Sequence, residues 1–385
     1  MYHRDISQAL LILVKKYPVV TLMGPRQSGK TTLVKSLFPQ KPYANLEAPD
    51  IRQLAIADPR AFLNQFPDGA ILDEIQRAPE LLSYIQVTVD AQNKNGLFIL
   101  TGSHQLHLHA AITQSLAGRT ALLDLYPMTL DELLQAGFNL SLDEQLYQGF
   151  YPRIYQHDLN ATQAYADYYS TYVERDVRQL IQLKDLNLFD TFMRLCAGRI
   201  GSLLDLSSLG NDVGVSAHTI NHWLSILEAS YLIIRLPPYF NNKSKRLIKS
   251  PKLYFTDVGL ACYLLNIEEP KQLKRDPLRG FLFENMVIME LIKMRSNLNK
   301  KPNLYFYRDN HKNEVDALLV SGDQYTAIEI KSAETFTPDF LKGLKVVQRT
   351  APERWVAGYI VYAGEYQQQV GAVHLINYKQ LRQIT

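Results

Sequence analysis

Residues 24–31 have the residue types and the spacing of a phosphate-binding loop. They form the sequence GPRQSGKT, a full match to GxxxxGK(S/T), between an apolar segment at residues 19–23 and a helical pattern at residues 30–38. In such a loop the glycines let backbone N–H groups surround phosphate oxygens, the lysine reaches the β and γ phosphates, and the last hydroxyl ligates Mg²⁺. We therefore predict a site for ATP and Mg²⁺, with Thr31 as a metal ligand. The predicted site consists of Gly24, Pro25, Arg26, Gln27, Ser28, Gly29, Lys30, Thr31 and Thr32.

Two adjacent carboxylates follow the next apolar segment. Asp73 and Glu74 come after a short predicted strand at residues 70–72. We expect Asp73 to hold Mg²⁺ through its water shell and Glu74 to orient and deprotonate the attacking water. A carboxylate pair at this distance after the glycine loop favours hydrolysis of the bound nucleotide.

Three further polar residues lie where they can act on the same nucleotide. Thr101 and Ser103 follow a predicted strand at residues 97–100. Their hydroxyls either bind the γ-phosphate or the attacking water, or only cap a turn at Gly102. Arg119 ends the run SLAGR. It either neutralises transition-state charge in a neighbouring subunit, as arginine fingers do, or forms a salt bridge at the surface.

A second group of polar residues lies near the end of the chain. Glu284 falls on a predicted helix, Asp316 in an apolar strand, and Glu329 and Lys331 in the next strand. The order Glu, Asp and Glu-x-Lys resembles the core of PD-(D/E)XK nucleases, and alternate residues of a strand share one face. Asp316 and Glu329, helped by Glu284, are then expected to hold one or two Mg²⁺ ions, and Lys331 to steady the water or the phosphate. The alternative is a retained fold without cleavage, in which Glu-x-Lys is an exposed cross-strand pair.

Positive charge is concentrated in one stretch of the chain. The formal net charge is +3, but residues 239–312 hold 15 Lys and Arg against 7 Asp and Glu, so the remainder sums to −5. A basic segment on an otherwise acidic protein favours an anionic partner. Its densest part follows two aromatic residues and is expected to contact a DNA backbone, with a solvated charged hairpin as the alternative. The cations of this part are Lys243, Lys245, Arg246, Lys249 and Lys252.

The elements that must position these residues indicate an α/β chain in three parts. Apolar strands separated by helical stretches predict a parallel, helix-covered P-loop sheet over residues 1–158. Residues 206–227 have the pattern of a helix-turn-helix, and the β-rich stretch after them is expected to form the wing of a winged helix. A helical and winged-helix domain is therefore predicted at residues 159–270. A helix, three strands and another helix then predict a small restriction-endonuclease-like α/β domain at residues 271–385.

The composition excludes several classes of protein. With 46% apolar and 21% charged residues, the chain is neither disordered nor collagen-like. No apolar run approaches the roughly 18 residues of a membrane span, and the N-terminus lacks the apolar core of a signal peptide. We therefore expect a cytoplasmic protein without a membrane partner. The two cysteines, Cys196 and Cys262, stand apart in apolar surroundings and are expected to be buried, reduced thiols.

Six short runs carry a resemblance to a known family. They are GPRQ at 24–27, LDEIQ at 72–76, LTGS at 100–103, LAGR at 116–119, KLYFTDVGL at 252–260 and FEN at 283–285. Together they resemble the prokaryotic AAA-type P-loop ATPases with a C-terminal domain of unknown function, over residues 5–331. The resemblance implies an AAA-like ATPase core, a winged-helix middle and a nuclease-like end.

Two functions are compatible with these features. The first is an ATP-driven machine, assembled as a homo-oligomer, that acts on DNA. In it the winged helix and the basic segment tether the DNA, and the nuclease-like domain is a cutter or a clamp. The second is a signalling or protein-remodelling ATPase whose C-terminal domains only bind protein partners. Stimulation of ATP hydrolysis by DNA separates the two.

Overall fold

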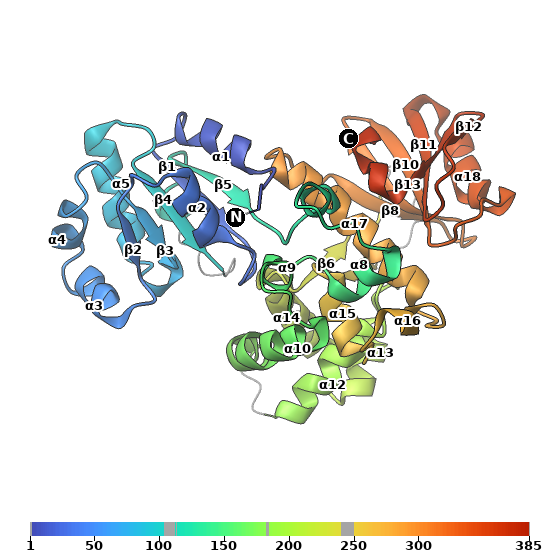
Figure 1. The fold of residues 1–385 in the computed structure, drawn as a ribbon, viewed down its shortest axis with the longest axis horizontal. Coiled ribbons are helices and arrows are strands. Elements are labelled where there is room, and N and C mark those ends of the chain that lie inside the picture. The colour runs from blue at the N-terminus through green and yellow to red at the C-terminus, as the bar shows by residue number, and fades with distance from the viewer. Residues whose placement is uncertain (1, 104–111, 113, 182–184, 240–249, 385) are drawn as a thin grey trace. The chain divides into compact units, whose positions relative to one another are not determined.

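The computed structural model describes residues 2–103, 112, 114–181, 185–239 and 250–384, and the chain forms two compact units (Figure 1). The first unit comprises residues 1–128, 229–231 and 296–300. The second comprises residues 129–228, 232–295 and 301–385. The chain therefore returns to the first unit twice after leaving it.

The first unit is built on a sheet of five parallel strands. In spatial order they are β2 (Tyr43–Asn45), β3 (Ile71–Asp73), β4 (Phe98–Gly102), β1 (Val19–Met23) and β5 (Thr120–Asp124). Every neighbouring pair is parallel, which confirms the parallel sheet that the sequence predicts. The carboxyl ends of the strands therefore lie along one edge, where sheets of this type bind their ligands.

Helices cover both faces of this sheet. They are α1 (Ser7–Val14), α2 (Lys30–Leu37), α3 (Pro49–Ala57), α4 (Pro59–Asn64) and α5 (Leu81–Gln92). All five residues of β1 are buried, and its apolar residues alternate between two cores. Val19 and Met23 join the core that α4 and α5 complete, whereas Val20 and Leu22 join the core that contains α1 and α2. Burial on both faces explains why β1 is an almost continuous apolar run.

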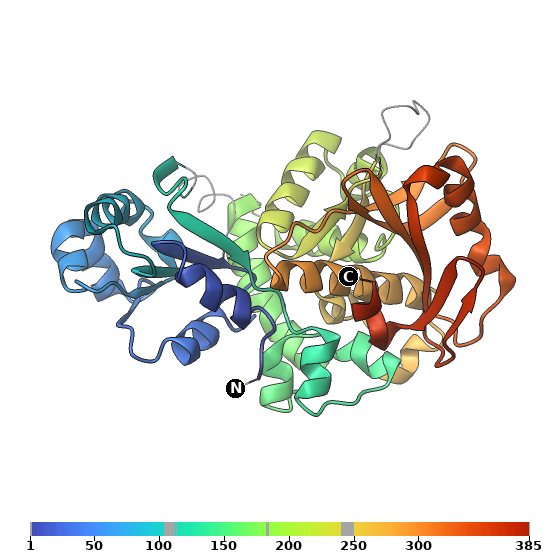
Figure 2. The same cartoon turned by 90° about the horizontal axis from the view of Figure 1, so that it is seen from above.

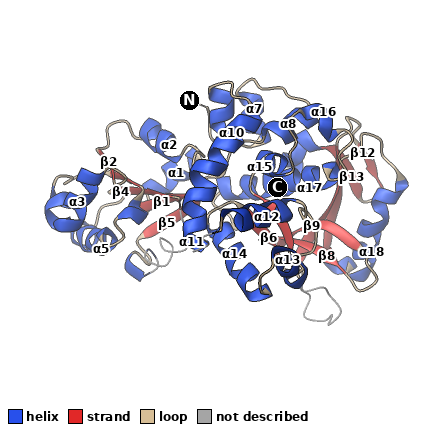
Figure 3. Ribbon diagram, turned by 90° about the horizontal axis from the view of Figure 1, so that it is seen from below, coloured by secondary structure: helices blue, strands red, loops and turns tan. Residues whose placement is uncertain are grey.

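The second unit begins with a series of helices, drawn in blue in Figure 3. These are α7 (Leu130–Gln135), α8 (Leu142–Gln148), α9 (Pro152–Gln156), α10 (Ala161–Tyr168), a π-helix (Tyr169–Val177), α11 (Arg178–Ile181), α12 (Leu186–Ala197), α13 (Leu206–Val213), α14 (Ala217–Ala229), α15 (Val258–Leu264), α16 (Pro270–Leu273) and α17 (Arg279–Asn297).

The helix-turn-helix predicted at residues 206–227 corresponds to α13 and α14. Gly214 ends α13 with a φ of 84°, in the left-handed region that favours glycine. The hydroxyl of Ser216 accepts the N–H of Thr219 at 3.1 Å and so caps α14. The next strand, β6 (Ile233–Leu236), pairs antiparallel with β7 (Lys252–Phe255). The two helices, the turn and the strand are thus confirmed, and the winged-helix assignment stays a prediction.

The second unit ends in a six-stranded mixed sheet, at the red end of the chain in Figure 2. Its strands, in spatial order, are β12 (Gln368–Val370), β13 (Val373–Asn377), β11 (Trp355–Tyr362), β10 (Gln324–Lys331), β9 (Glu314–Ser321) and β8 (Leu304–Arg308). Strands β10, β11 and β13 run parallel, and the remaining pairs are antiparallel. The helix α18 (Lys342–Thr350) packs Leu344 and Val347 into the core of this sheet. The predicted helix, three strands and following helix are confirmed, whereas β11, β12 and β13 were not predicted, and the nuclease-like assignment stays a prediction.

Two expectations from composition meet the structure directly. Within the described residues, no helix combines the length and the apolarity that a membrane span requires. Cys196 and Cys262 are both buried and free, as predicted. The three-domain division at residues 158 and 270 stays a prediction.

Candidate functional site

The phosphate-binding loop connects β1 to α2 at the carboxyl edge of the first sheet. Gly24 has a φ of +148°, and a Cβ atom there would lie 2.1 Å from the backbone oxygen of Leu125. Gly29, the residue before α2, has a φ of +94°. Both positions therefore require glycine, the first because β5 continues directly against it and the second because of its backbone angles. The loop thus has the tight backbone that a phosphate cradle needs.

Lys30 points its ammonium group back over this loop. Its Nζ donates to the backbone oxygens of Gly24 at 2.9 Å and Pro25 at 2.7 Å, and the residue is only 5% exposed. Burial lowers the pKa of Lys30 to about 8, although the charges of Glu74 and Asp73 raise it. Negative charge at this loop would stabilise the ammonium form, so the position favours a polyanion such as a nucleotide phosphate chain.

Arg4 holds the loop from outside the motif. Its Nη1 donates to the backbone oxygen of Ser28 at 2.7 Å, and its Nη2 donates to that of Tyr126 at 2.6 Å. Arg4 is only 5% exposed, so both charge-assisted bonds are shielded from water. The loop is thereby tied to the segment that follows β5. Sequence reasoning missed Arg4, because nothing in the N-terminal helical pattern distinguishes it from a surface cation.

Asp73 ends β3 and accepts hydrogen bonds from three hydroxyl groups. Its Oδ2 accepts from Thr31 at 2.8 Å and from Tyr43 at 2.7 Å, and its Oδ1 accepts from Thr101. Asp73 is 4% exposed. The side chains of Thr31 and Asp73 thus present adjacent oxygens beside Lys30, and oxygen donors of this kind are those that Mg²⁺ prefers. The residues present fit the magnesium site that the sequence predicts.

Tyr43 is a member of this site that sequence reasoning did not find. It lies on β2, the strand next to β3, and burial and its bond to Asp73 raise its pKa above the usual value. The Nζ of Lys35 lies 3.4 Å from the centre of its ring. The only available signal was its place on a strand parallel to the one that ends in Asp73, and that short strand was not predicted.

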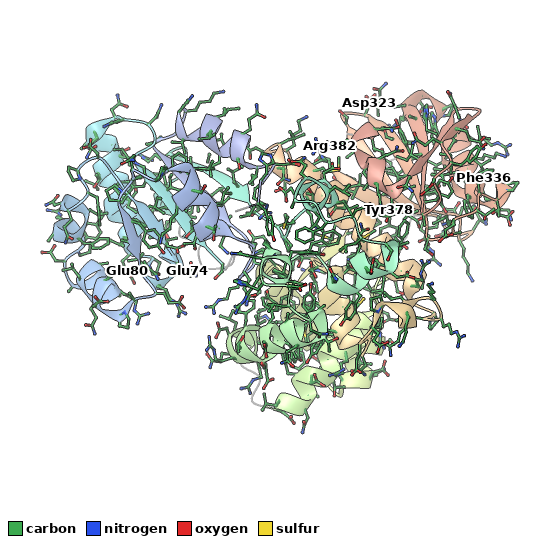
Figure 4. All side chains as sticks on the ribbon, viewed as in Figure 1. Glu74, Glu80, Asp323, Phe336, Tyr378 and Arg382 are labelled. Carbon is green, nitrogen blue, oxygen red and sulfur yellow. The ribbon has the colours of Figure 1, made fainter. Side chains whose placement is uncertain are left out.

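Glu74 follows Asp73 with an unusual backbone. Its φ of 56° and ψ of 47° are left-handed, a conformation that costs a non-glycine residue free energy and that is frequent at functional sites. Its Oε2 accepts hydrogen bonds from Ser103 at 3.2 Å and from Gln76 (Figure 4 labels Glu74). Gln76 also donates to Ser103 at 3.1 Å.

The hydroxyls of Thr101 and Ser103 therefore contact the two carboxylates. Both residues are fully buried at the end of β4, and Thr101 also accepts the backbone N–H of Glu74 at 3.3 Å. The sequence suggested that these hydroxyls bind the γ-phosphate or the attacking water, or cap a turn at Gly102, and it did not suggest these contacts with the carboxylates. Their contact with the γ-phosphate or the attacking water stays a prediction.

Arg119 lies at the opposite edge of the sheet from the phosphate-binding loop. It immediately precedes β5, where Thr120 is paired with Val19 at the start of β1. Its guanidinium makes a two-pronged salt bridge with Asp90 of the same chain, at 2.6 and 2.8 Å. A five-residue strand spans about 16 Å, so Arg119 does not reach the phosphate-binding loop of its own chain. The salt bridge that the sequence allowed is present, and the arginine-finger role in a neighbouring subunit stays a prediction.

In the second unit, Lys252 lies among carboxylates of the C-terminal sheet and of α17. Its Nζ lies 2.9 Å from Oε1 of Glu284, 2.6 Å from Oε1 of Glu314 and 4.0 Å from Oδ1 of Asp316. Tyr254 adds a hydrogen bond of 2.5 Å to Glu284. Lys252 is 3% exposed. This contradicts its predicted place on a DNA-binding surface, because an ammonium group buried among three carboxylates is not available to phosphates. The other four cations of that prediction, Lys243, Lys245, Arg246 and Lys249, lie outside the described residues.

Lys331 connects Glu329, the remaining carboxylate of the predicted set, to Asp316. Its Nζ lies 2.6 Å from Oε1 of Glu329 and 3.5 Å from Oδ2 of Asp316. Asp316 therefore stands between the two lysines, and its Oδ2 also accepts the backbone N–H of Ile330 at 2.7 Å. The six residues that form this carboxylate–lysine cluster are Lys252, Glu284, Glu314, Asp316, Glu329 and Lys331.

Burial and neighbouring charges both shift the pKa values of this cluster. Burial and the charge of Asp316 raise the pKa of Glu284 to about 7 and that of Glu329 to about 8. Burial lowers the pKa of Lys252, but the charges of Glu284, Asp316 and Glu314 outweigh it and raise the pKa above its usual value. Both lysines are therefore positively charged at neutral pH.

The structure brings the predicted carboxylates together, with lysines beside them, and their role as metal ligands stays a prediction. Within the described residues, no group of three or more His, Cys, Asp and Glu side chains is placed to hold a metal ion. The cations beside Glu284, Asp316 and Glu329 are instead the two lysines. Sequence reasoning missed Glu314 and misplaced Lys252, although the apolar run LYF after Lys252 was a signal of burial.

Family models match three consecutive parts of the chain. Residues 16–134 match an AAA domain. Residues 139–271 match a domain of unknown function (DUF8612), and residues 279–381 match another (DUF4143). The AAA match contains the phosphate-binding loop, Asp73 and Glu74, so the first unit contains an AAA-type P-loop ATPase domain.

Curated relatives extend over most of the chain. Uncharacterized proteins of Mycobacterium tuberculosis and Mycobacterium bovis are each 30% identical over 368 residues, which cover 94% of this chain and 80% of theirs. An uncharacterized protein of Haemophilus influenzae is 21% identical over 314 residues, covering 69% of this chain and 74% of its own.

Solved structures show more distant similarity. A Walker-type ATPase of Pyrococcus abyssi has a TM-score of 0.47 at 16% identity, covering 69% of this chain and 96% of its own. AMPPCP-bound DnaA from Aquifex aeolicus has a TM-score of 0.30 at 16% identity, covering 58% and 85%. On the evidence of the sequence relatives, this chain belongs to the family of the uncharacterized mycobacterial proteins, with an AAA domain at residues 16–134.

Proposed function

We propose that the protein is a Mg²⁺-dependent ATPase that uses hydrolysis to act on DNA. The observation that carries the ATPase part is the cluster at the carboxyl edge of the first sheet. There the Thr31 hydroxyl lies 2.8 Å from Asp73, Lys30 is buried against the loop, and Glu74 follows directly. These are the groups that nucleotide hydrolysis at a P-loop needs, on adjacent elements.

Each of these residues has a separate task in the proposed reaction. Lys30 neutralises charge on the β and γ phosphates, and the P-loop amides orient them. Thr31 and Asp73 would hold the magnesium ion, which neutralises phosphate charge when bound. Glu74 orients the attacking water and accepts its proton. Ser103 and Gln76, which contact Oε2 of Glu74, fix where this carboxylate points.

The DNA part of the proposal draws on the elements after the AAA domain. The helices α13 and α14, joined at Gly214 and followed by the β6–β7 pair, have the order of elements of a winged helix. Residues 239–312 carry a local excess of positive charge, which suits an anionic partner. We further propose that the protein is a homo-oligomer in which Arg119 acts across the interface.

For residues 271–385 we propose a restriction-endonuclease-like fold that clamps DNA and does not cleave it in the described arrangement. Strands β9 and β10 carry Asp316 and the Glu-x-Lys pair side by side, as the predicted fold requires. We do not propose DNA cleavage, because Lys252 and Lys331 lie beside the carboxylates that would have to bind the metal ions of such a site.

One observation favours the alternative of a signalling or protein-remodelling ATPase. The exposed residues near the start of α14 include His218, Asn221 and His222 but no Lys or Arg, so this face offers no fixed cation to a phosphate. A winged helix of this kind suits a protein partner better than a DNA groove.

ATP turnover in the presence of DNA tests the proposal. The purified full chain is assayed with Mg²⁺ alone and with single-stranded, duplex and branched DNA, using Lys30→Ala as the control for contaminating ATPases. We expect basal turnover that one or more of the DNAs raises and that Lys30→Ala lacks. Turnover that no DNA changes would refute the DNA part and favour the alternative. Absence of any turnover above the Lys30→Ala control would refute the ATPase itself.

A further inference from the structure

The carboxyl groups of the carboxylate–lysine cluster lie beside cations of the chain itself. Four carboxylates meet there, from Glu284 on α17, Glu314 and Asp316 on β9, and Glu329 on β10. Three cations face them: Lys252, Lys331 and Arg308, whose Nη1 lies 3.0 Å from Oε2 of Glu314. Carboxylates gathered in a buried position repel one another unless cations stand between them.

Lys252 holds the central position in this arrangement. It lies within 4.0 Å of three of the four carboxylates, and it is the cation next to both Glu284 and Asp316. These are two of the three residues that a divalent ion would have to share. Lys252 is only 3% exposed, and its ammonium group would compete with such an ion for the oxygens of Glu284 and Asp316.

One carboxyl oxygen of the cluster has no hydrogen-bond partner among the described residues. Among the described residues, no group donates a hydrogen bond to Oε2 of Glu329, although this oxygen is buried and the residue is only 9% exposed. Buried polar atoms of native proteins usually have a partner, so an unpaired carboxylate oxygen points to a missing cation or donor. The cluster therefore combines internal cations with one carboxyl oxygen that has no partner among the described residues.

We propose that Lys252 is the built-in counter-cation of this cluster and that Lys252 and a divalent metal ion exclude each other there. While Lys252 is in place, the domain is held together without metal and is not a nuclease. Removal of the Lys252 charge would leave Glu284, Asp316 and Glu329 free to share a divalent ion. This inference rests on the proposed nuclease-like fold of residues 271–385, and it adds which residue excludes a metal ion from that site.

The test measures Mn²⁺ affinity of the full chain by calorimetry, without nucleotide. An Asp73→Asn background removes the metal ligand of the nucleotide site. Lys252→Gln should bind Mn²⁺ at least about tenfold more tightly than the background chain, because it removes a positive charge adjacent to the ligands. Arg308→Gln is the matched control. It removes the same charge from the same cluster, but within the described residues its ion pair is with Glu314, so we expect less than about a threefold gain.

The outcomes separate this inference from the proposed function. Equal Mn²⁺ affinity with and without Lys252, or an equal gain in Arg308→Gln, would overturn the counter-cation role while leaving the ATPase and its DNA stimulation intact. Loss of the gain when Asp316→Asn is added to Lys252→Gln would support the proposed ligand set. If Lys252→Gln does not fold, Lys252→Met, which keeps the aliphatic stem, is melted with and without Mn²⁺. A rise in Tm with Mn²⁺ supports the inference, and a chain that Mn²⁺ does not stabilise overturns it.

Discussion

Replacement of Tyr43 by Phe tests whether the hydroxyl contacts around Asp73 set the magnesium requirement. The change deletes the 2.7 Å hydrogen bond to Oδ2 of Asp73 and keeps the ring beside Lys35. A hydrogen bond to a charged group contributes about 1.5–3 kcal/mol, and the partial exposure of Tyr43 places it near the lower end. Because about 1.4 kcal/mol corresponds to a factor of ten, we expect the half-saturating Mg²⁺ concentration for ATP hydrolysis to rise about tenfold.

The assay is a magnesium titration of ATP turnover at saturating ATP. At saturating Mg²⁺ the Tyr43→Phe chain should recover close to the full rate, because Tyr43 positions Asp73 and does not contact the reacting atoms. Tyr84→Phe is the control, since it removes a hydroxyl from α5 of the same unit. An unchanged half-saturating concentration in Tyr43→Phe would refute the positioning role, and a rate that excess Mg²⁺ does not restore would show that Tyr43 acts in the chemical step.

Three further outcomes are expected. Glu74→Gln should retain ATP binding and lose hydrolysis, measured as bound nucleotide and released phosphate, and turnover at the normal rate would contradict its role as the base. Arg119→Ala should reduce turnover by about 10³-fold or more if the arginine completes a neighbouring site. Asp90→Ala breaks the same salt bridge and keeps the arginine, so it should leave ATP turnover nearly unchanged. If Asp90→Ala and Arg119→Ala reduce turnover equally, the role of Arg119 is structural. With Lys252 buried, four cations remain in the densest part of the basic segment, so log K for duplex DNA should fall with log salt at a slope of about −3.6. Replacing the three cations of residues 243–246 by Ala should flatten the slope to about −0.9, and a slope near zero in the unmodified chain would indicate a protein partner.

The parts of the nucleotide site that the sequence predicts are those encoded in contiguous residues. The loop of residues 24–31 and its flanking strand and helix lie where the sequence places them, because a glycine loop between an apolar run and a helix is a local pattern. Asp73 and Glu74 were found for a related reason: they end a buried strand, and such ends meet at one edge.

The missing parts depend on contacts between distant segments. Arg4 lies 24 residues from the loop oxygen it binds, and Tyr43 lies 30 residues from Asp73. Neither has a neighbour in sequence that marks it as functional. Lys252 was misplaced for the converse reason: proximity in sequence to four other cations suggested a shared surface, whereas the strand β7 that begins with it is buried throughout.

Because Arg4 is hydrogen-bonded to the phosphate-binding loop, the rate of proteolysis after Arg4 can be used to measure how often the loop opens. Trypsin cleaves after arginine, and the guanidinium of Arg4 is buried and bonded to the backbone oxygens of Ser28 and Tyr126, which hides it from the protease. Cleavage at this bond therefore reports on opening of the loop, in a segment that lies outside the nucleotide-binding motif itself. A nucleotide that rigidifies the loop should slow the removal of the first four residues, which gives a label-free measure of occupancy.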